Sequence, residues 1–254
     1  MNKLGRTEHH ISTRIGRAIG DYNLIEENNK VLVAVSGGKD SLTLLKLLKM
    51  REKWSPVKFK IFAAHIKTDF SCSSCTHTDS IEKICAKLDV PFTMRNISVL
   101  DKNKKTTCFW CSWNRRKALF NIADELGCSK VAFGHHKDDI IETTLLNLFF
   151  HGEIASMNPR QELFKGKLVI IRPLCYVEER MMKKYAEENG FPSKICKCPN
   201  SQDSNRRYIK NFIRDLEKRS PDIKSNIFNS ASRIKYEYLN VKEDKEGVDM
   251  ILKD

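Results

Sequence analysis

The stretch KVLVAV-SGGKDS-LTLLKLLKM, residues 30–50, constrains the fold of this chain more than any other feature. KVLVAV is a short, continuous apolar run of the kind that forms a buried strand. Two glycines interrupt the chain after it, and the apolar spacing then becomes that of a helix. A strand that passes through a glycine turn into a helix belongs to a βαβ unit. The sequence therefore predicts an α/β fold.

The rest of the chain repeats this alternation of strands and helices. Further strands are predicted at 59–66, 91–97, 130–136 and 168–174, and helices at 12–23, 78–88, 111–126, 139–150, 177–189, 206–218 and 221–238. Right-handed βαβ units of this kind build a doubly wound, mostly parallel sheet. We expect helical additions at the N-terminal and C-terminal ends of that sheet.

Polar clusters stand at the ends of three predicted strands. They are SGGKDS (36–41), the segment 65–69, and GHHKDD (134–139). Ligands of open α/β sheets bind beyond the carboxyl ends of the strands. The three clusters therefore predict one shared binding site.

SGGKDS has the composition of a phosphate-binding loop. Gly37 and Gly38 allow a tight turn that presents backbone N–H groups, and Lys39 adds a positive charge at a helix N-terminus. The loop is neither a Walker motif nor Gly-x-Gly-x-x-Gly. The alternative is a plain glycine turn in which Asp40 or Ser41 caps the helix.

GHHKDD combines a glycine with two histidines and two carboxylates. Gly134 permits close approach of the backbone to a ligand, and Asp138 or Asp139 suits magnesium or the positioning of an attacking group. Asp139 and Glu142 also fit the acid variant of a capping box, so one aspartate could serve only to begin the helix. No further histidine has the spacing for a zinc site.

The chain has nine cysteines, an odd number, and we expect it to be in a reducing compartment. Metal binding or thiol chemistry is therefore a better interpretation of these cysteines than a disulfide framework. Cys108 and Cys111 have a spacing shared by zinc, iron–sulfur and redox sites. Cys196 and Cys198 could complete a four-cysteine zinc site, or one of them could complete a three-cysteine iron–sulfur site. The remaining cysteines are interpreted as an adventitious loop pair, Cys72 and Cys75, and as small core residues, Cys85, Cys128 and Cys175.

The helix that follows Cys111 has distinct faces. Its apolar stripe, from Ala118 to Leu126, lies on the same face as Cys111, and Arg115 is one turn after that cysteine. We therefore expect Arg115 to point toward the cysteine site. Arg116 and Lys117 are expected to point away from it, toward an RNA backbone or solvent.

The charge of the chain favours a polyanionic partner. Its formal net charge is +13, and basic residues gather at 9–20, 114–117 and 205–220. No apolar run is long enough for a membrane helix, and the N-terminus lacks the apolar core of a signal peptide. We expect a cytoplasmic protein that binds RNA and no membrane.

SGGKDS, Cys-x-x-Cys followed by basic residues, and GHHKDD together resemble the tRNA 2-thiocytidine synthetase (TtcA) family of PP-loop ATP pyrophosphatases. The likeness runs from DYNLIEENNKVLVAVSGGKDS through GHHKDDIIETTLLNLFF and IRPL to the cysteines near 198. The related tRNA 2-thiouridine enzymes (TtuA) carry zinc-binding cysteine pairs at both ends, which have no counterpart here. The resemblance implies a Rossmann-like fold of the adenine nucleotide alpha hydrolase type. It also implies ATP-dependent thiolation of tRNA, with cytidine 32 in the anticodon loop as the target. The loop SCSSCTHTDS departs from longer members, which leaves the target base open.

Members of this family adenylate a base carbonyl oxygen with ATP and Mg²⁺, then replace that oxygen with sulfur. Their 4Fe–4S cluster is held by three cysteines, and the remaining iron can bind sulfide, which a closed zinc site cannot do. The resemblance places the cluster ligands at Cys108, Cys111 and Cys198, with Cys196 as the alternative third ligand. It places the pyrophosphate of the nucleotide at Ser36, Gly37, Gly38, Lys39, Asp40 and Ser41, and the adenosine near Ala34, Val35 and His65. From the GHHKDD segment we add Gly134 and His135 to the nucleotide site. Asp138 or Asp139, together with Arg115, are our candidates for orienting the reacting groups and stabilising charge. For His65 the alternative is a hydrogen-bonded histidine at a strand end.

The same resemblance suggests how the chain is divided. We expect an N-terminal helical segment at 1–28, a PP-loop domain at 29–178, a C-terminal helical region with the third cysteine at 179–240, and a charged tail at 241–254. The partners would be tRNA and a sulfur donor, either a cysteine desulfurase or free sulfide, and a homodimer is one option. Two other functions stay open: a tRNA lysidine synthetase-type ligase, and a zinc-stapled RNA-binding module with a degenerate ATP loop.

Overall fold

The computed structural model describes residues 5–70, 78–192 and 205–239. Within these ranges six strands form one sheet in the order β3-β2-β1-β4-β6-β5, and only β5 runs antiparallel to its neighbour. The strands are β1 (Asn29–Ala34), β2 (Phe59–Thr68), β3 (Phe92–Ile97), β4 (Lys130–Ala132), β5 (Arg160–Leu163) and β6 (Leu168–Ile171). The doubly wound, mostly parallel sheet predicted from the sequence is confirmed.

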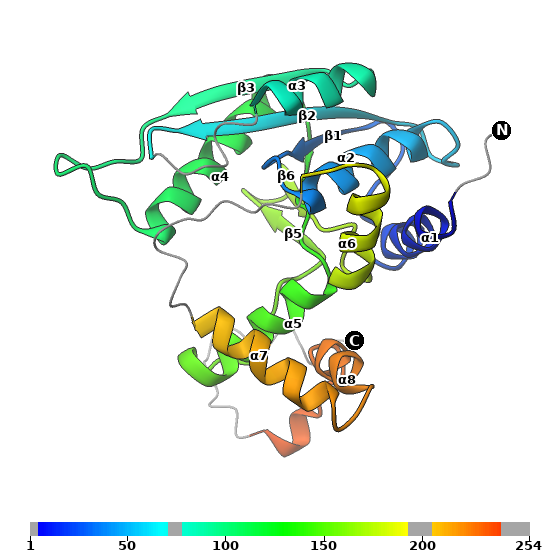
Figure 1. Cartoon of the computed structure of the whole chain (residues 1–254), viewed down its shortest axis with the longest axis vertical. Coiled ribbons are helices and arrows are strands. Elements are labelled where there is room, and N and C mark those ends of the chain that lie inside the picture. The colour runs from blue at the N-terminus through cyan, green and yellow to red at the C-terminus, as the bar shows by residue number, and fades with distance from the viewer. Residues whose placement is uncertain (1–4, 71–77, 193–204, 240–254) are drawn as a thin grey trace.

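Helices cover both faces of this sheet (Figure 1). One face carries α1 (Arg6–Asp21), α2 (Lys39–Glu52), α3 (Thr78–Lys87) and α6 (Glu179–Glu188), and the opposite face carries α4 (Cys108–Glu125). The other helices are α5 (Lys137–Leu146), the π-helical turn η2 (Asn147–His151), α7 (Asn205–Glu217), α8 (Ile223–Ser230) and the 3₁₀ turn η4 (Tyr236–Tyr238). None of the helices in the described ranges is both long and apolar enough to cross a membrane.

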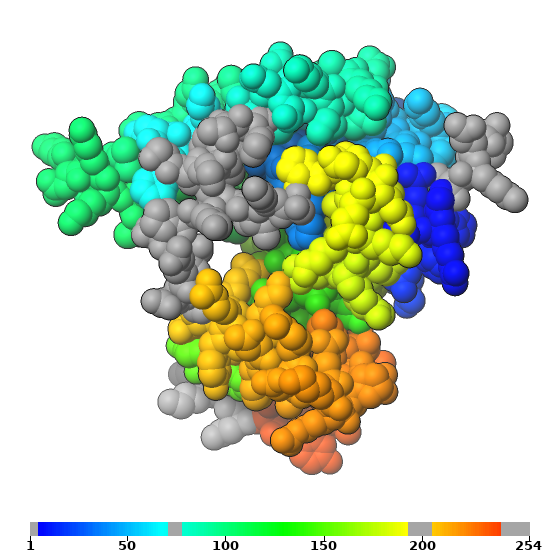
Figure 2. All heavy atoms as spheres, in the orientation of Figure 1, coloured from blue at the N-terminus to red at the C-terminus, as the bar shows by residue number. Residues whose placement is uncertain are grey.

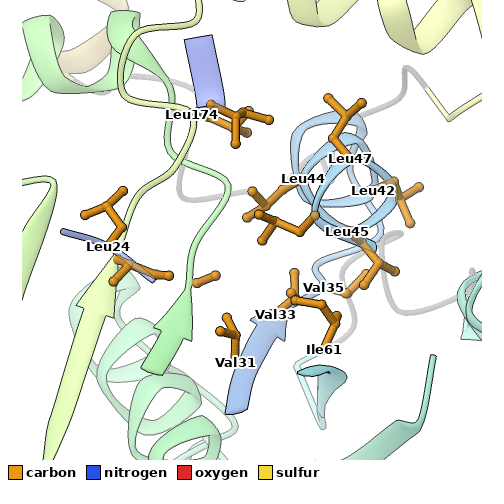
Figure 3. Packing of buried hydrophobic residues seen from close by; sticks show 14 of the residues in the cluster. Leu24, Val31, Val33, Val35, Leu42, Leu44, Leu45, Leu47, Ile61 and Leu174 are labelled. Atoms are coloured by element: carbon orange, nitrogen blue, oxygen red, sulfur yellow. The ribbon is translucent and has the colours of Figure 1, made fainter. Parts of the chain in front are cut away.

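The core explains why residues 31–35, VLVAV, are all apolar. Val31 and Val33 of β1 belong to the cluster that packs against α2, whereas Leu32 belongs to the cluster beneath α4. Figure 3 shows Leu44 and Leu45 of α2 lying against this side of the sheet. A strand covered on both faces buries alternate side chains in two different layers. This burial fixes β1 at the centre of the sheet and the SGGKDS loop at its carboxyl edge.

The C-terminal helices pack beside the sheet rather than on it. α7 and α8 contact α5, and Ile141, Leu145, Ile209 and Ile213 form a small separate core between α5 and α7. We call α5, α7 and α8 the helical lobe; Figures 1 and 2 show α7 and α8 below the sheet layer. Because α5 begins within the GHHKDD segment, at Lys137, this lobe adjoins the carboxyl edge of the sheet.

Several predicted boundaries were wrong. β4 ends at Ala132, four residues before the predicted end, and α4 begins at Cys108, three residues before the predicted start. Thr107 caps α4, since its hydroxyl accepts a hydrogen bond from the Trp110 N–H at 3.1 Å.

β5 was missed because its sequence, RQEL, has no apolar run. The helix predicted over 221–238 ends at Ser230, whose hydroxyl bonds to the Ile227 carbonyl and competes with the backbone.

Candidate active site

A pocket of about 480 Å³ opens at the carboxyl edge of the sheet, between the SGGKDS loop and the first two turns of α4. This volume is in the range of small-molecule and cofactor sites. Eleven of the residues predicted from the sequence line it: Ala34, Val35, Ser36, Asp40, Ser41, Cys108, Cys111, Arg115, Gly134, His135 and Asp139. Two of the three predicted polar clusters, SGGKDS and GHHKDD, therefore meet in this pocket, whereas the segment 65–69 contributes only the apolar Ile66. Gly37, Gly38, Lys39, His65 and Asp138 lie outside the lining.

Hydrogen bonds within the SGGKDS loop fix its shape. The Ser41 hydroxyl accepts from the Ser36 N–H at 3.1 Å and donates to the Gly38 carbonyl at 3.0 Å. Gly37 has φ of +86°, which is in the left-handed region that favours glycine, and a Cβ there would meet Ile81 at 3.2 Å. α2 begins at Lys39, so its first N–H groups are at the end of this loop. The loop has the form expected of an anion site at a helix N-terminus.

The two charged residues of the loop have different surroundings. Lys39 is buried, and its ammonium contacts Asp40 at 2.9 Å and Glu179 of α6 at 3.9 Å. Asp40 lines the pocket, and its Oδ1 is buried with no hydrogen-bond partner among the described residues. A buried carboxylate oxygen without a partner is costly unless a ligand completes it. The pocket therefore has one acceptor suited to a cation.

Gly134 is required by the packing of the protein itself. A Cβ at this position would lie 3.0 Å from the Ser41 nitrogen and 3.1 Å from the Asp40 carbonyl carbon. The loop after β4 thus passes against the backbone of the SGGKDS loop. The sequence predicted close approach to a ligand, and the approach in the structure is to the neighbouring loop.

His65 has a structural contact at the end of β2. Its ring is buried, and Nδ1 donates a hydrogen bond to the Val35 carbonyl at 2.7 Å. Burial lowers the pKa of His65 and keeps the imidazole neutral. The histidine therefore supports the backbone that leads into the loop, as the alternative interpretation of this residue expected.

His135 lies in the pocket with its ring stacked on Phe133, the centroids being 5.7 Å apart. Burial lowers the pKa of His135 to about 4, although Asp139 opposes that shift. Nδ1 of His135 is buried without a partner among the described residues. A neutral imidazole with an unused ring nitrogen is suited to hydrogen bonding with a bound ligand.

Asp138 and Asp139 are adjacent but face different surroundings. Asp138 is buried outside the pocket lining, where it accepts from the Glu179 N–H at 2.7 Å and pairs with Lys224 at 2.9 Å. Burial by itself would raise the pKa of Asp138, but these two contacts outweigh it and hold the pKa below its usual value. Asp139 lines the pocket and pairs with Arg206 of α7 at 2.8 Å.

The capping box of α5 is one turn earlier than predicted. His136 is the N-cap, and its Nδ1 accepts from the Asp139 N–H while the Asp139 carboxylate accepts from the His136 N–H at 3.0 Å. The predicted box had Asp139 and Glu142. The error arose because histidine is an uncommon N-cap, whereas aspartate is a preferred one. Asp139 combines this capping role with its place in the pocket.

α4 brings its two cysteines to the pocket on one helix face. Cys108, Cys111 and Arg115 line the pocket, and further along Ala118 and Ile122 continue this side into the core. In the described part of the chain no three His, Cys, Asp or Glu side chains form a metal-binding group. The predicted third ligand, Cys198, and its alternative Cys196 lie outside the described residues, as do Cys72 and Cys75. Cys85, Cys128 and Cys175 are buried, which confirms their interpretation as core residues.

One prediction about α4 was wrong. Arg115 lines the pocket as expected, but Arg116 lines it as well and contributes to lowering the pKa of His135. Lys117 does point away, because its ammonium lies over the ring of Trp113, 5.4 Å from the centroid. The pocket wraps around the first turns of α4, so it reaches more of the helix than one face.

Sequence reasoning missed two features of the pocket. Phe133 was assigned to a strand, yet it lies in the pocket and packs on His135. Arg206, which pairs with both Asp139 and Glu142, was assigned to an RNA-binding helix. The sequence offered no signal for the second contact, because α7 is distant from α5 along the chain.

A glycine-rich loop between a parallel strand and a helix, at the carboxyl edge of a doubly wound sheet, is the arrangement of α/β nucleotide-binding proteins. A family model described as "PP-loop domain" matches residues 7–220. A curated relative from Janthinobacterium sp. (strain Marseille), named tRNA-cytidine(32) 2-sulfurtransferase, is 40% identical over 250 residues, covering 95% of this chain and 77% of the relative. A relative of the same name from Herminiimonas arsenicoxydans is 39% identical over 240 residues, covering 92% and 74%. The chain belongs to the PP-loop domain family, and within it to the tRNA-cytidine(32) 2-sulfurtransferases.

A solved structure supports the fold independently. The U34-tRNA thiolase NcsA from Methanococcus maripaludis, solved with its 4Fe–4S cluster, has a TM-score of 0.76 to this chain. The two proteins are 22% identical, and the match covers 92% of this chain and 80% of NcsA. At this level of identity the similarity extends to the fold.

Proposed function

We propose that this chain is an ATP-dependent tRNA sulfurtransferase that forms 2-thiocytidine at position 32 of tRNA. The observation that carries this proposal is the shared pocket, in which the SGGKDS loop faces Cys108 and Cys111. The relatives that are 40% and 39% identical carry the corresponding name. A ligase of the lysidine synthetase type would not need these cysteines, and a zinc-stapled RNA-binding module would not need an intact loop.

ATP fits the loop side of the pocket. The backbone of residues 36–41 would bind its phosphates, and Ala34 and Val35 would lie near the adenosine. The buried Lys39 ammonium, which contacts Asp40 and Glu179, adds positive charge close to that loop. His135 would offer its unpartnered ring nitrogen to the nucleotide.

Mg²⁺ fits the carboxylates of the same side. Asp40 and Asp139 both line the pocket, and Asp40 has a buried oxygen that lacks a partner among the described residues. Carboxylate oxygens together with phosphate oxygens are the usual ligands of Mg²⁺ in nucleotide sites. Asp138 is a weaker candidate, since Glu179 and Lys224 already occupy its carboxylate.

A 4Fe–4S cluster fits the cysteine side of the pocket. Cys108 and Cys111 would be two of its ligands, and Cys198, outside the described residues, would be the third. Thiolates are the ligands that such clusters require. When bound through three cysteines, the cluster supplies an iron with an open coordination position for the incoming sulfur.

The residues of the pocket support both halves of the reaction. In the first half, the carbonyl oxygen of the base attacks the α-phosphorus of ATP, and pyrophosphate leaves from the SGGKDS loop. In the second half, sulfide adds to the adenylated carbon, and AMP departs with the original oxygen. Arg115 and Arg116 border the pocket and would stabilise the negative charge on the phosphate as it forms and leaves. Asp139 would position the nucleotide through magnesium.

Three further assignments remain part of this proposal. The basic segments 9–20, 114–117 and 205–220 would bind the phosphates of the tRNA around its anticodon loop. The division into segments 1–28, 29–178, 179–240 and 241–254 still has the status of a prediction. The sulfur donor would be a cysteine desulfurase or free sulfide, and a homodimer is one option.

The proposal is tested by mass spectrometry of nucleosides from tRNA of a strain that lacks this gene. We expect 2-thiocytidine to be absent, to return with the wild-type gene, and to stay absent with Cys111→Ala. An unchanged nucleoside profile in the deletion strain would contradict the proposal. Anaerobic purification gives a second check, since a colourless protein with one bound zinc and no iron would support the RNA-binding module.

A further inference from the structure

We propose that the outer face of the first turns of α4 is a stacking platform for unpaired bases of the RNA substrate. The platform consists of Phe109, Trp110 and Trp113 together with Lys117. It rests on the proposed function only in that the substrate is a tRNA. The exposure, stacking and charge that carry it are observed outside the nucleotide side of the pocket, and the pocket enters only to place the platform relative to the target base.

The three aromatic side chains of the platform are exposed to an unusual extent. Phe109 is 77% exposed, Trp110 50% and Trp113 47%. The two indole rings stack on each other, with centroids 5.8 Å apart and planes inclined by 13°. Apolar rings gathered at one place on a surface indicate a binding site, because scattered exposure is common and clustered exposure is not.

Helical spacing puts these rings on the side of α4 that faces away from the pocket. Phe109 and Trp110 are four and three positions before Trp113, and Lys117 is four positions after it, so the four side chains share one broad face. The pocket is lined by Cys108, Cys111 and Arg115 on the opposite side of the helix, and by Arg116, which lies between the two sides. A helix is about 10–12 Å across with its side chains, and successive stacked nucleotides of one strand are about 3.4 Å apart. The platform would therefore hold bases about three nucleotides from the base that enters the pocket.

The charge around the platform selects RNA as the occupant. Between residues 100 and 120 the chain has six Lys or Arg and a single acidic residue, Asp101. Lys102, Lys104 and Lys105 are exposed in the loop that precedes α4, and the Lys117 ammonium lies over the Trp113 ring. Aromatic faces beside cations are the usual means of binding single-stranded RNA, since bases stack on the rings and phosphates pair with the cations. A second copy of this chain would bring the same positive charge to the contact and be repelled.

The platform is tested by the anisotropy of a labelled anticodon stem-loop RNA at fixed salt concentration. Trp110→Ala and Trp113→Ala should each weaken binding roughly tenfold, the usual scale of one base–aromatic stack. Trp113→Phe, which keeps an aromatic face, should stay within about threefold of the wild type. Trp54→Ala is the matched control and should bind like the wild type. Trp54 is also exposed (53%) and lies against a cation, Arg51, but it is in the turn that follows α2 and not in α4. Thermal melting verifies that each variant is folded.

An RNA variant sharpens this test. Abasic sites in the loop, beside the target cytidine, should weaken binding to the wild-type protein and have no effect on binding to Trp113→Ala.

If the doubly substituted Trp110→Ala, Trp113→Ala protein binds the RNA as tightly as the wild type, the platform is refuted and the sulfurtransferase proposal stands. If Trp113→Ala instead converts a dimer into a monomer in sedimentation without RNA, the face is a subunit interface and the platform is also refuted. A wild-type protein that thiolates no tRNA would overturn the proposed function itself.

Discussion

The two sides of the pocket are built in opposite ways. The SGGKDS side is held by hydrogen bonds among its own residues, such as those of the buried Ser41 hydroxyl, and by the close passage of Gly134. The cysteine side is the exposed beginning of a helix, where Cys108 is exposed and Cys111 half-buried. One side depends on backbone shape and the other on side-chain chemistry.

This difference has a consequence for substitutions. A nucleotide phosphate is recognised by N–H groups at fixed positions, so a change on the loop side acts through shape and also alters stability. A thiolate acts through its sulfur, so a change on the cysteine side removes chemistry while the fold is kept. The four predictions that follow set one side against the other, beginning with the largest expected effect.

Cys111→Ala should abolish thiolation and leave ATP binding and the melting temperature near wild-type values. The expected loss of thiolated nucleoside is roughly 100-fold or more, since even indirect support of a metal ligand is worth about 10–100-fold. Mass spectrometry of tRNA nucleosides measures the product, and calorimetry measures the melting temperature. Cys128→Ala is the matched control, because Cys128 is buried in the core under α4 and should keep thiolation. If Cys111→Ala kept full thiolation, the cysteine side of the pocket would not act through the sulfur of Cys111.

Unlike Cys111→Ala, Gly134→Ala should reduce the stability of the fold and the affinity for ATP together. The new Cβ would lie 3.0 Å from the backbone nitrogen of Ser41, so one of the two loops must move. Overpacking of this kind costs about 1–3 kcal/mol of unfolding free energy, and displacement of the anion loop should weaken ATP binding roughly tenfold. Denaturant unfolding and isothermal titration measure the two effects.

Gly20→Ala is the control for that substitution. A Cβ at Gly20, in α1, would meet no atom within 4 Å. It should leave ATP affinity unchanged and raise stability by up to about 1 kcal/mol, the difference in helix propensity between alanine and glycine. Equal behaviour of the two variants would mean that the contact at Gly134 has no energetic importance.

The SGGKDS side of the pocket was easier to predict from the sequence than the cysteine side, because its structure depends on residues that are consecutive in the chain. β1 and the SGGKDS loop are defined by an apolar run and two glycines that are consecutive in the chain, so their structure is local. The early start of α4 depends on Thr107 as a cap, and β5 pairs at the sheet edge without an apolar pattern. Local patterns predict elements better than they predict element boundaries.

Side-chain surroundings were predicted least well where they depend on distant segments. Nothing near Asp138 in the sequence indicates that Glu179 and Lys224 bind its carboxylate. Arg116 was expected to point away from the site, because helical spacing describes a face and does not describe how far a pocket extends around it. Such contacts are formed only when the sheet and the helical lobe come together.

Asp138 and Asp139 give a third test, in which neighbouring carboxylates should separate stability from activity. Asp139→Asn should reduce thiolation roughly tenfold or more, since Asp139 lines the pocket. Asp138→Asn should reduce the unfolding free energy by about 1.5–3 kcal/mol, the contribution of a hydrogen bond to a charged group. Because the pKa of Asp138 is lowered in the folded protein, its contribution is fully present above the unfolded pKa of about 3.9.

The pH dependence of that stability difference supplies the control. As the pH falls below about 4 and through the lowered pKa of Asp138, the carboxylate takes up a proton and the gap between wild type and Asp138→Asn should shrink. Urea unfolding between pH 3 and pH 7 measures it. A gap that is constant over this range would mean that the contacts of Asp138 do not depend on its charge.

His135 lines the pocket beside Gly134, and its titration gives the smallest expected effect. Burial lowers its pKa to about 4 in the folded protein, against about 6.5 in an unfolded chain. Its contribution to stability is therefore fully present above pH 6.5 and declines as the pH falls toward 4, because the unfolded state then binds the proton more readily. His135→Gln should flatten this part of the stability profile, although His65, whose pKa is also lowered by burial, should preserve some slope. His10→Gln, which removes an exposed imidazole from α1, is the control for the loss of a histidine. NMR of the imidazole carbons measures the titration directly. A His135 signal that moves between pH 6 and pH 7 would show that water reaches this part of the pocket. The ring would then not be held neutral for the nucleotide.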